Sequence, residues 1–190
     1  MSIDTQAYLF VHFIGEERNP TDEQLYFALS RDGVHWRDLR PAGSPALTWL
    51  GGEKGVRDPH IVRDPRGGFH IVATDLSIYY RGGWGPNDGA TTNGSTGLVI
   101  WDSPDLVHWS EPRLVDVASK IPDAGMAWAP ERIGIRIAGS GSCSGPRRAT
   151  PKAPRIHWPT SSAIRRMCIM RRPLISGCSP IRSSGSIVRM

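Results

Sequence analysis

Two stretches of this chain, LYFALSRDGVHWRDL at 25–39 and LVIWDSPDLVHWSEP at 98–112, are copies of one pattern. They align without gaps at an offset of 98 − 25 = 73 residues. Each begins as an alternating strand and continues as Ser-x-Asp-x-x-His-Trp. The Ser and Asp can cap a tight turn by accepting hydrogen bonds from backbone amides, and the Trp adds a large apolar surface. The shared residues are Ser30, Asp32, His35 and Trp36 in the first copy and Ser103, Asp105, His108 and Trp109 in the second.

Further strand sequences precede each copy. AYLFVHFIG at 7–15 precedes the first and PHIVRDPRGGFHIVATD at 59–75 the second, and we interpret each stretch as a strand pair. Gly67 and Gly68 lie where the second pair needs a hairpin turn. Units of about four short strands at a long period are typical of β-propeller blades. The sequence therefore predicts an all-β fold, with the first two blades of a propeller and the start of a third; a β-sandwich with two similar hairpins is the alternative.

Charge divides the chain at Glu131. All 18 acidic residues and 11 of the 23 Lys and Arg lie at or before Glu131, so residues 1–131 sum to 11 − 18 = −7. The remaining 59 residues sum to +12 and contain all three cysteines. The second part is rich in Arg, Ser, Pro and Gly and lacks a sustained periodic pattern. We therefore predict a partial propeller domain at 1–131 and a basic, disordered tail at 132–190.

An ordered set of motifs between residues 7 and 131 resembles glycoside hydrolase family 43. The motifs are YLFVHF, YFALSRDGVHW, GVRDPHIVR, IVATD, WDSPDLVHWSEPRLVDVA and AGMAWAPE. The resemblance implies a five-bladed propeller that cleaves arabinose- and xylose-containing glycans with inversion. Such an enzyme needs a carboxylate base and a carboxylic acid held roughly 6.5–9.5 Å apart. A fructan-acting relative, which would retain configuration, is a further possibility.

The resemblance assigns the catalytic base to Asp58 in GVRDPHI. Pro59 fixes the local backbone and suits the start of a strand. Without the resemblance, the alternative is that Asp58 pairs with Arg57 or Arg63 or caps a turn. Asp64 also precedes a proline, but its surroundings have hairpin composition, so we expect it in a turn.

Four further residues are predicted to contact the substrate. Trp128 and Glu131 in AWAPE resemble an inner strand where an aromatic ring stacks on a sugar and an acid binds hydroxyls; inter-blade packing is the alternative for Trp128. Asp75 and His12 are predicted to face the channel, although a structural role is commoner for a histidine in a strand such as YLFVHF. We expect no cofactor and no metal site, and a channel calcium ion stays open because no ligand set points to it.

The tail leaves the predicted active site without its acid. In the family a Glu proton donor and a second Asp lie in later blades, but no acidic residue follows Glu131. Loss of general-acid help alone costs about 10²–10⁴ in rate, so we expect this chain to be inactive.

A slip of reading frame would explain the tail. Codons for Glu131–Arg148, read from their third bases, can spell ADWDPDRGQRFVFWASA, an acidic turn followed by an aromatic strand. Codons for Arg166–Ser183 can spell NVYYATTADFRLFTDPV, in which YYATTADFRLF is a third copy of the repeat. The hypothesis is a one-base slip at or near Glu131, with the last 59 residues translated out of frame.

Two other functions are open. A propeller fragment without catalysis would be a carbohydrate-binding or scaffold module. The tail could instead bind nucleic acid, but Trp158 is its one aromatic residue, and such arms use interleaved aromatic rings. We expect an oligosaccharide or polysaccharide partner rather than nucleic acid or a membrane. The N-terminus lacks a signal-peptide pattern and no apolar run reaches the ~18 residues of a membrane span, so we predict a cytoplasmic protein.

Overall fold

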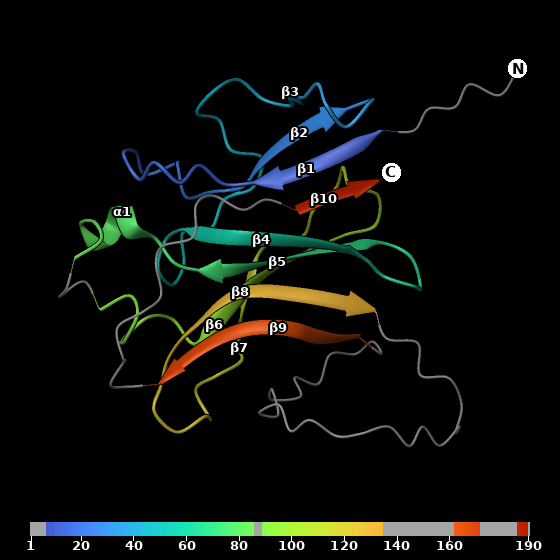
Figure 1. The fold of residues 1–190 in the computed structure, drawn as a ribbon. Coiled ribbons are helices and arrows are strands. Elements are labelled where there is room, and N and C mark those ends of the chain that lie inside the picture. The colour runs from blue at the N-terminus through green and yellow to red at the C-terminus, as the bar shows by residue number, and fades with distance from the viewer. Residues whose placement is uncertain (1–6, 86–88, 135–161, 172–185, 190) are drawn as a thin grey trace, which may run out of the picture.

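The computed structural model describes residues 7–85, 89–134, 162–171 and 186–189. Within these ranges the chain is almost entirely β, with one four-residue helix, α1 (Ile78–Arg81). The strands pair antiparallel in two four-stranded sheets and one two-stranded sheet (Figure 1). No helix in the described part is long and apolar enough to cross a membrane.

The first sheet has the order β10-β1-β2-β3. Its strands are β1 (Tyr8–His12), β2 (Tyr26–Ser30), β3 (Arg37–Asp38) and β10 (Ser186–Arg189). Alternation along β1 buries Leu9 and Val11, while the residues between them are partly exposed on the other face. Before the first copy of the repeat the described chain forms a single strand, β1, so the expected strand pair is wrong there.

The second sheet has the order β4-β5-β6-β7. Its strands are β4 (Val56–Arg63), β5 (Phe69–Asp75), β6 (Gly97–Ser103) and β7 (Arg113–Asp116). The turn predicted for Asp64 is confirmed, because its Oδ1 accepts from the Arg66 amide at 2.8 Å. Gly68 is required in this hairpin, since its φ is +84° and a Cβ would lie 2.9 Å from the carbonyl oxygen of Ser103.

The third sheet joins β8 (Ala124–Gly134) to β9 (Ser162–Arg171). Both β9 and β10 lie in the part of the chain for which the sequence predicts a disordered tail, and the structure describes them as strands paired with β8 and β1. An open strand edge presents unpaired N–H and C=O groups, and both segments add to such an edge. The run SAIRRMCIMR has enough apolar residues to form a strand once an edge is available.

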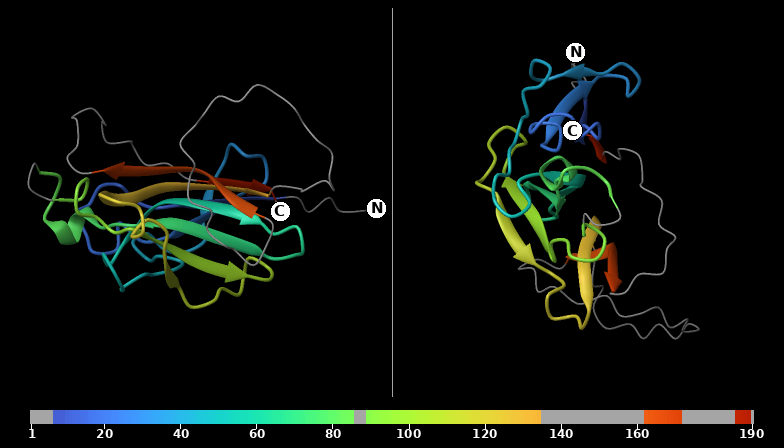
Figure 2. Two further views of the ribbon diagram at one scale, coloured as in Figure 1. Left: turned by 90° about the horizontal axis from the view of Figure 1, so that it is seen from below. Right: turned by 90° about the vertical axis from the view of Figure 1, so that its left-hand side faces the viewer.

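The sheets fan out around one side of an axis, as blades of a partial β-propeller (Figure 2). Strand β4 of the second sheet lies against β8 on one side and against β1 and β10 on the other. Apolar residues fill both spaces between sheets. The first space holds Leu9, Val11, Leu25, Phe27, Val56, Ile61, Ile71, Ala73, Val99 and Trp101. The second holds Val72, Leu98, Ile100, Val117, Ala118 and Ala127. The predicted all-β propeller class is therefore confirmed.

The repeated motif forms the same turn twice. In the first copy the Ser30 Oγ accepts from the Gly33 amide at 2.8 Å, and the Asp32 Oδ1 accepts from the His35 amide at 2.8 Å. The Nδ1 of His35 lies 2.7 Å from Asp32 Oδ2. The second copy repeats these distances with Ser103, Asp105, Leu106 and His108. These hydrogen bonds hold the pKa of both aspartates well below the usual range.

The tryptophan at the end of each turn packs against a phenylalanine. Trp36 lies 5.5 Å from Phe10 within its own sheet, measured between ring centroids. Trp109 lies 5.8 Å from Phe27 of the neighbouring sheet. The second turn therefore joins the two blades through the apolar surface of its tryptophan.

Candidate active site

Asp58 lies on β4 in a conformation that costs free energy. Its φ is +48°, although a residue before proline normally adopts an extended conformation. The register between β4 and β5 shifts between Arg57 and His60, so Asp58 lies in a bulge of the inner strand. A non-glycine residue in this region costs about 1–3 kcal/mol, and such residues concentrate at functional sites.

The neighbouring strand β8 repeats this feature. Ala129 has a φ of +50° and also precedes a proline. Thr74, at the end of β5, joins the two strained residues and is completely buried. Its Oγ1 lies 3.4 Å from Asp58 Oδ2, to which it donates, and it accepts from the Ala129 amide at 2.9 Å. Thr74 thus holds the Asp58 carboxylate relative to the third blade.

Arg57, next to Asp58, belongs to a buried ion-pair network. Its Nη1 lies 2.6 Å from an Oε1 of both Glu17 and Glu23. The guanidinium also lies over two aromatic rings, 4.8 Å from the Phe13 centroid and 5.4 Å from the Trp84 centroid. The ion pairs of Arg57 are therefore made with glutamates of the preceding segment.

Glu23 connects this network to the start of α1. Its side chain is 1% exposed and accepts from Ser77 Oγ at 2.6 Å, from the Ile78 amide at 2.9 Å and from the Tyr79 amide at 3.0 Å. A carboxylate at a helix N-terminus satisfies amides that lack partners within the helix. Sequence reasoning missed Glu23, because its partners lie 34 to 56 residues away in the chain.

Two tryptophans meet beside the Asp58 strand. Trp84 and Trp128 are in edge-to-face contact, with centroids 6.2 Å apart and an interplanar angle of 80°. Trp84 is 42% exposed and its Nε1 donates to Glu17 Oε1 at 2.8 Å. Trp128 packs partly against the cluster of Leu76, Ile78 and Ala90. Its buried Nε1 is without a hydrogen-bond acceptor in the described residues, so Trp128 combines packing with an unsatisfied donor.

Asp75 is engaged with the loop before β4. It is 1% exposed, and its Oδ1 accepts from Trp49 Nε1 at 2.8 Å and from the Glu53 amide at 2.9 Å. A Cβ at Gly52 would lie 2.4 Å from the other carboxylate oxygen. The contacts of Asp75 thus hold the 49–53 loop against the sheet.

His12 lies on β1 and Glu131 on β8, and both strands contact β4, which carries Asp58. His12 is on β1, stacked between Phe10 at 5.0 Å and Tyr26 at 5.8 Å, and burial lowers its pKa. Glu131 is partly exposed on β8, beside a register shift between β8 and β9. Thr74 therefore links Asp58 to the amide of Ala129, the residue after Trp128.

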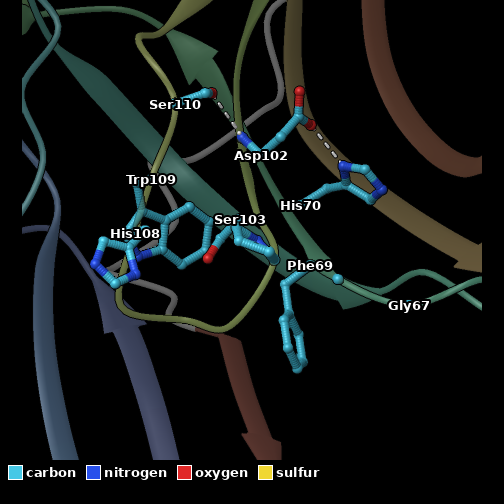
Figure 3. A pocket seen from close by; sticks show the side chains of 10 residues that line it. Gly67, Phe69, His70, Asp102, Ser103, His108, Trp109 and Ser110 are labelled. Atoms are coloured by element: carbon cyan, nitrogen blue, oxygen red, sulfur yellow. Dashed lines mark hydrogen bonds and ion pairs between the residues drawn. The ribbon is translucent and has the colours of Figure 1, made fainter.

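A separate hollow of about 540 Å³ lies at the other end of the second sheet (Figure 3). It is lined by the start of β5, the end of β6 and the repeated turn, including Phe69, His70, Asp102 and Trp109. His70 Nδ1 lies 2.6 Å from Asp102 Oδ1. Burial alone would raise the pKa of Asp102, but hydrogen bonds from Arg113 and His70 outweigh burial and lower it. Phe69 begins β5, whereas Thr74, which contacts Asp58, is the next-to-last residue of that strand, so this hollow is remote from Asp58.

The chemistry available near Asp58 is that of an oriented carboxylate beside aromatic rings. A carboxylate can remove a proton from water, and tryptophan faces can stack on sugar rings. The described residues contain no group of three or more His, Cys, Asp or Glu side chains that could hold a metal ion.

Comparison with known proteins gives one family and one relative. A family model described as "Probable glycosyl hydrolase domain" matches residues 4–135. An alpha-L-arabinofuranosidase of Bifidobacterium longum subsp. longum is 31% identical over 96 residues, which cover 48% of this chain and 9% of that protein. The chain thus spans about a tenth of the length of that relative. No solved structure gave a significant match.

Proposed function

Because the chain belongs to the family of probable glycosyl hydrolase domains, we propose that the complete protein is an inverting glycosidase in which Asp58 is the base. Its substrates would be arabinose- or xylose-containing glycans, and the name of the aligned relative favours arabinofuranosides. The observation that carries the proposal is the Asp58 carboxylate, strained at φ +48° and held by Thr74 where β4 meets β8.

In the proposed reaction, Asp58 removes a proton from the water that attacks the anomeric carbon. A carboxylic acid on the opposite side of the sugar protonates the leaving oxygen, so the product has inverted configuration. Thr74 fixes the orientation of the Asp58 carboxylate, and Trp128 with Trp84 offers aromatic surface for the sugar ring. Glu131 is proposed to bind hydroxyl groups. Asp75 and His12 would support the walls around the site through the contacts described above.

We propose that the 190-residue chain itself is inactive. It contains the base, but no acidic residue follows Glu131 to act as the proton donor from a later blade. The proposed boundary between the propeller domain and the tail is at residue 131, and the frame slip near Glu131 accounts for the tail. The second candidate function is carbohydrate binding without catalysis, which the Trp84–Trp128 pair beside Asp58 favours.

The test compares the 190-residue chain with the protein obtained by restoring the reading frame at the Glu131 codon. The assay is hydrolysis of aryl α-L-arabinofuranosides and aryl β-D-xylosides, with the anomer of the first product identified by NMR. The restored protein should release an inverted sugar and the 190-residue chain should release none. Asp58→Asn should remove the activity by a factor of about 10² or more. Asp64→Asn, in the other Asp-Pro pair, is the matched control and should retain it.

Turnover by the 190-residue chain would overturn its proposed inactivity. Full activity of the restored Asp58→Asn protein would overturn the assignment of the base. Sugar binding by the restored protein without any hydrolysis would support the second candidate function instead.

A further inference from the structure

We propose that Lys54 and Tyr80 form a subsite for an anionic sugar, a uronate residue of the glycan whose reacting sugar lies at Asp58. This role presupposes the glycan-binding function proposed above, because the subsite takes one residue of the same ligand. It specifies the charge of the substrate, which neither the family description nor the name of the aligned relative gives.

The exposed aromatic rings of the described residues gather in one short segment. Tyr79, Tyr80 and Trp84 are 37%, 46% and 42% exposed, and every other Phe, Tyr or Trp side chain in the described ranges is buried or partly buried. Tyr79 and Tyr80 belong to α1, which follows β5 at the end of the sheet where β4 begins (Figure 1). Trp84 contacts Trp128 beside the Asp58 strand. Aromatic rings offer apolar area to the C–H faces of sugars, so this segment extends the aromatic surface of the candidate site outward.

Lys54 supplies a cation to this surface. Its Nζ lies 5.4 Å from the centroid of the Tyr80 ring, within the range of a cation–π interaction. Lys54 is exposed, and within the described part of the chain no carboxylate pairs with its ammonium group. The contact with Tyr80 uses the charge of the ammonium group but none of its three N–H donors, which are therefore available to a ligand.

The backbone of Lys54 is held in a strained conformation. Its φ is +64°, a region where non-glycine residues cost free energy and concentrate at active sites and ligand clamps. The Lys54 amide donates to the Gly51 carbonyl oxygen at 2.7 Å, and the Lys54 carbonyl oxygen accepts from Nε2 of the buried Gln24 at 3.0 Å. These bonds fix the point at which the Lys54 side chain leaves the loop before β4.

The acidic neighbour of Lys54 is neutralised by a different cation. Glu53 Oε2 accepts from Arg81 Nε at 2.7 Å, and the two side chains are 18% and 17% exposed. This pair ties the loop of Lys54 to the helix of Tyr80 and leaves the charge of Lys54 unbalanced. A sugar ring that carries a carboxylate fits such a place, because its ring packs against Tyr80 while the carboxylate accepts charge-assisted hydrogen bonds from Nζ.

The subsite is close enough to Asp58 for one ligand to contact both. Lys54 precedes Asp58 by four residues, so their Cα atoms are at most about 14 Å apart. An oligosaccharide can therefore place one sugar at Asp58 and another at Lys54. The substrate class that fits is an arabinose- or xylose-containing glycan with uronate branches.

Binding of a matched pair of oligosaccharides tests the subsite. One ligand is a xylo-oligosaccharide with a single glucuronate branch, and the other is the same compound with its carboxyl group reduced to an alcohol. Binding of each to the unmodified 190-residue chain is measured by calorimetry at low ionic strength. The acidic ligand should bind tighter by about tenfold or more, the usual gain from hydrogen bonds to a charged group, and added salt should reduce the difference.

Four variants assign the preference to its residues. Lys54→Gln should remove the preference for the acidic ligand and leave binding of the reduced ligand unchanged. Lys54→Arg retains the charge and should retain the preference. Lys120→Gln is the matched control, because Lys120 is the other exposed lysine of the described residues and its loss should leave the preference intact. Tyr80→Leu should weaken binding of both ligands, because it removes the ring without changing the charge.

Equal binding of the two ligands, or binding of neither, would overturn the anionic subsite. A preference that Lys54→Gln leaves unchanged would belong to the basic residues 132–190 instead and would also overturn it. The hydrolysis assay on the frame-restored protein tests the proposed function separately. Preference through Lys54 without hydrolysis would support the subsite and contradict the enzyme, and hydrolysis without the preference would do the reverse.

Discussion

Replacement of Glu23 by glutamine should destabilise the fold far more than its near-identical volume implies. The Glu23 carboxylate accepts four hydrogen bonds, from Arg57, Ser77, Ile78 and Tyr79, at 2.6 to 3.0 Å. A glutamine offers one oxygen in place of two and turns an NH₂ group toward the remaining donors.

The expected loss follows from burial and charge. The side chains of Glu23 and Arg57 are 1% and 8% exposed, so the pair is scarcely screened by water. Removing one member of a buried ion pair costs about 3–5 kcal/mol, and each buried donor left without an acceptor costs about 1–3 kcal/mol. Glu17 still faces Arg57 in the variant, which limits the loss. We expect Glu23→Gln to lower the free energy of unfolding by about 3 kcal/mol.

The assay is urea unfolding of the full chain followed by tryptophan fluorescence. Glu16→Gln is the matched control, because Glu16 makes the same kind of pair with Arg18 at 3.2 Å but its side chain is 63% exposed. Exposed pairs contribute about 0–1 kcal/mol, so this variant should unfold close to the unmodified chain. Equal midpoints for the two variants would refute the role given to the buried network.

Three further predictions address the strained site, the repeated turn and a loop glycine. Thr74→Val should destabilise the chain by about 1–3 kcal/mol in thermal unfolding, because the Ala129 amide loses its acceptor. Thr74→Ser keeps the hydroxyl and should therefore restore the stability. Equal melting temperatures for the two variants would contradict the role of the Thr74 hydroxyl as acceptor. The Asp32 carboxylate raises the pKa of His35 above its ordinary 6.5. The pair therefore contributes its full stability between the usual pKa range of Asp and pH 6.5. This contribution is lost as the pH rises through the raised pKa of His35. Asp32→Asn should return the pKa of His35 toward 6.5 in an NMR titration, and an unchanged pKa would contradict the pairing. Gly52→Ala should lower the free energy of unfolding by more than the ~1 kcal/mol expected of a positive-φ glycine, because the new Cβ would lie 2.4 Å from a carboxylate oxygen of Asp75. Gly43→Ala is the control, because Gly43 has φ +76° and nothing lies within 4 Å of its added Cβ. Equal losses in the two variants would argue against the close contact.

The sequence predicted the features that depend on neighbouring residues. The Ser-x-Asp-x-x-His turn forms within six residues, so its hydrogen bonds could be foreseen and both copies are confirmed. The hairpin turn at Asp64 was predictable for the same reason. The propeller class followed from the repetition of these local units rather than from any single strand.

Contacts between distant segments were not predictable in this way. Nothing near Glu23 in the sequence indicates that its carboxylate caps a helix 54 residues later. The sequence predicts that Asp75 faces the channel. Its bonds to the 49–53 loop depend on how that loop folds back, so no neighbouring residue indicates them. The sequence predicts a strand pair before the first repeat copy, whereas the structure has the single strand β1 there, paired with the distant β10.

The most direct test of the account is the sequence of the coding DNA from the Glu131 codon to beyond the codon of Met190. The account predicts that the frame shifted at Glu131 stays open, encodes a third copy of the repeated turn and continues into strands that carry further Asp and Glu residues. Those residues would include the acid that complements Asp58. A shifted frame that closes soon after Glu131 would contradict the account, since the basic tail would then be the genuine product and Asp58 would have no proton donor in the encoded protein.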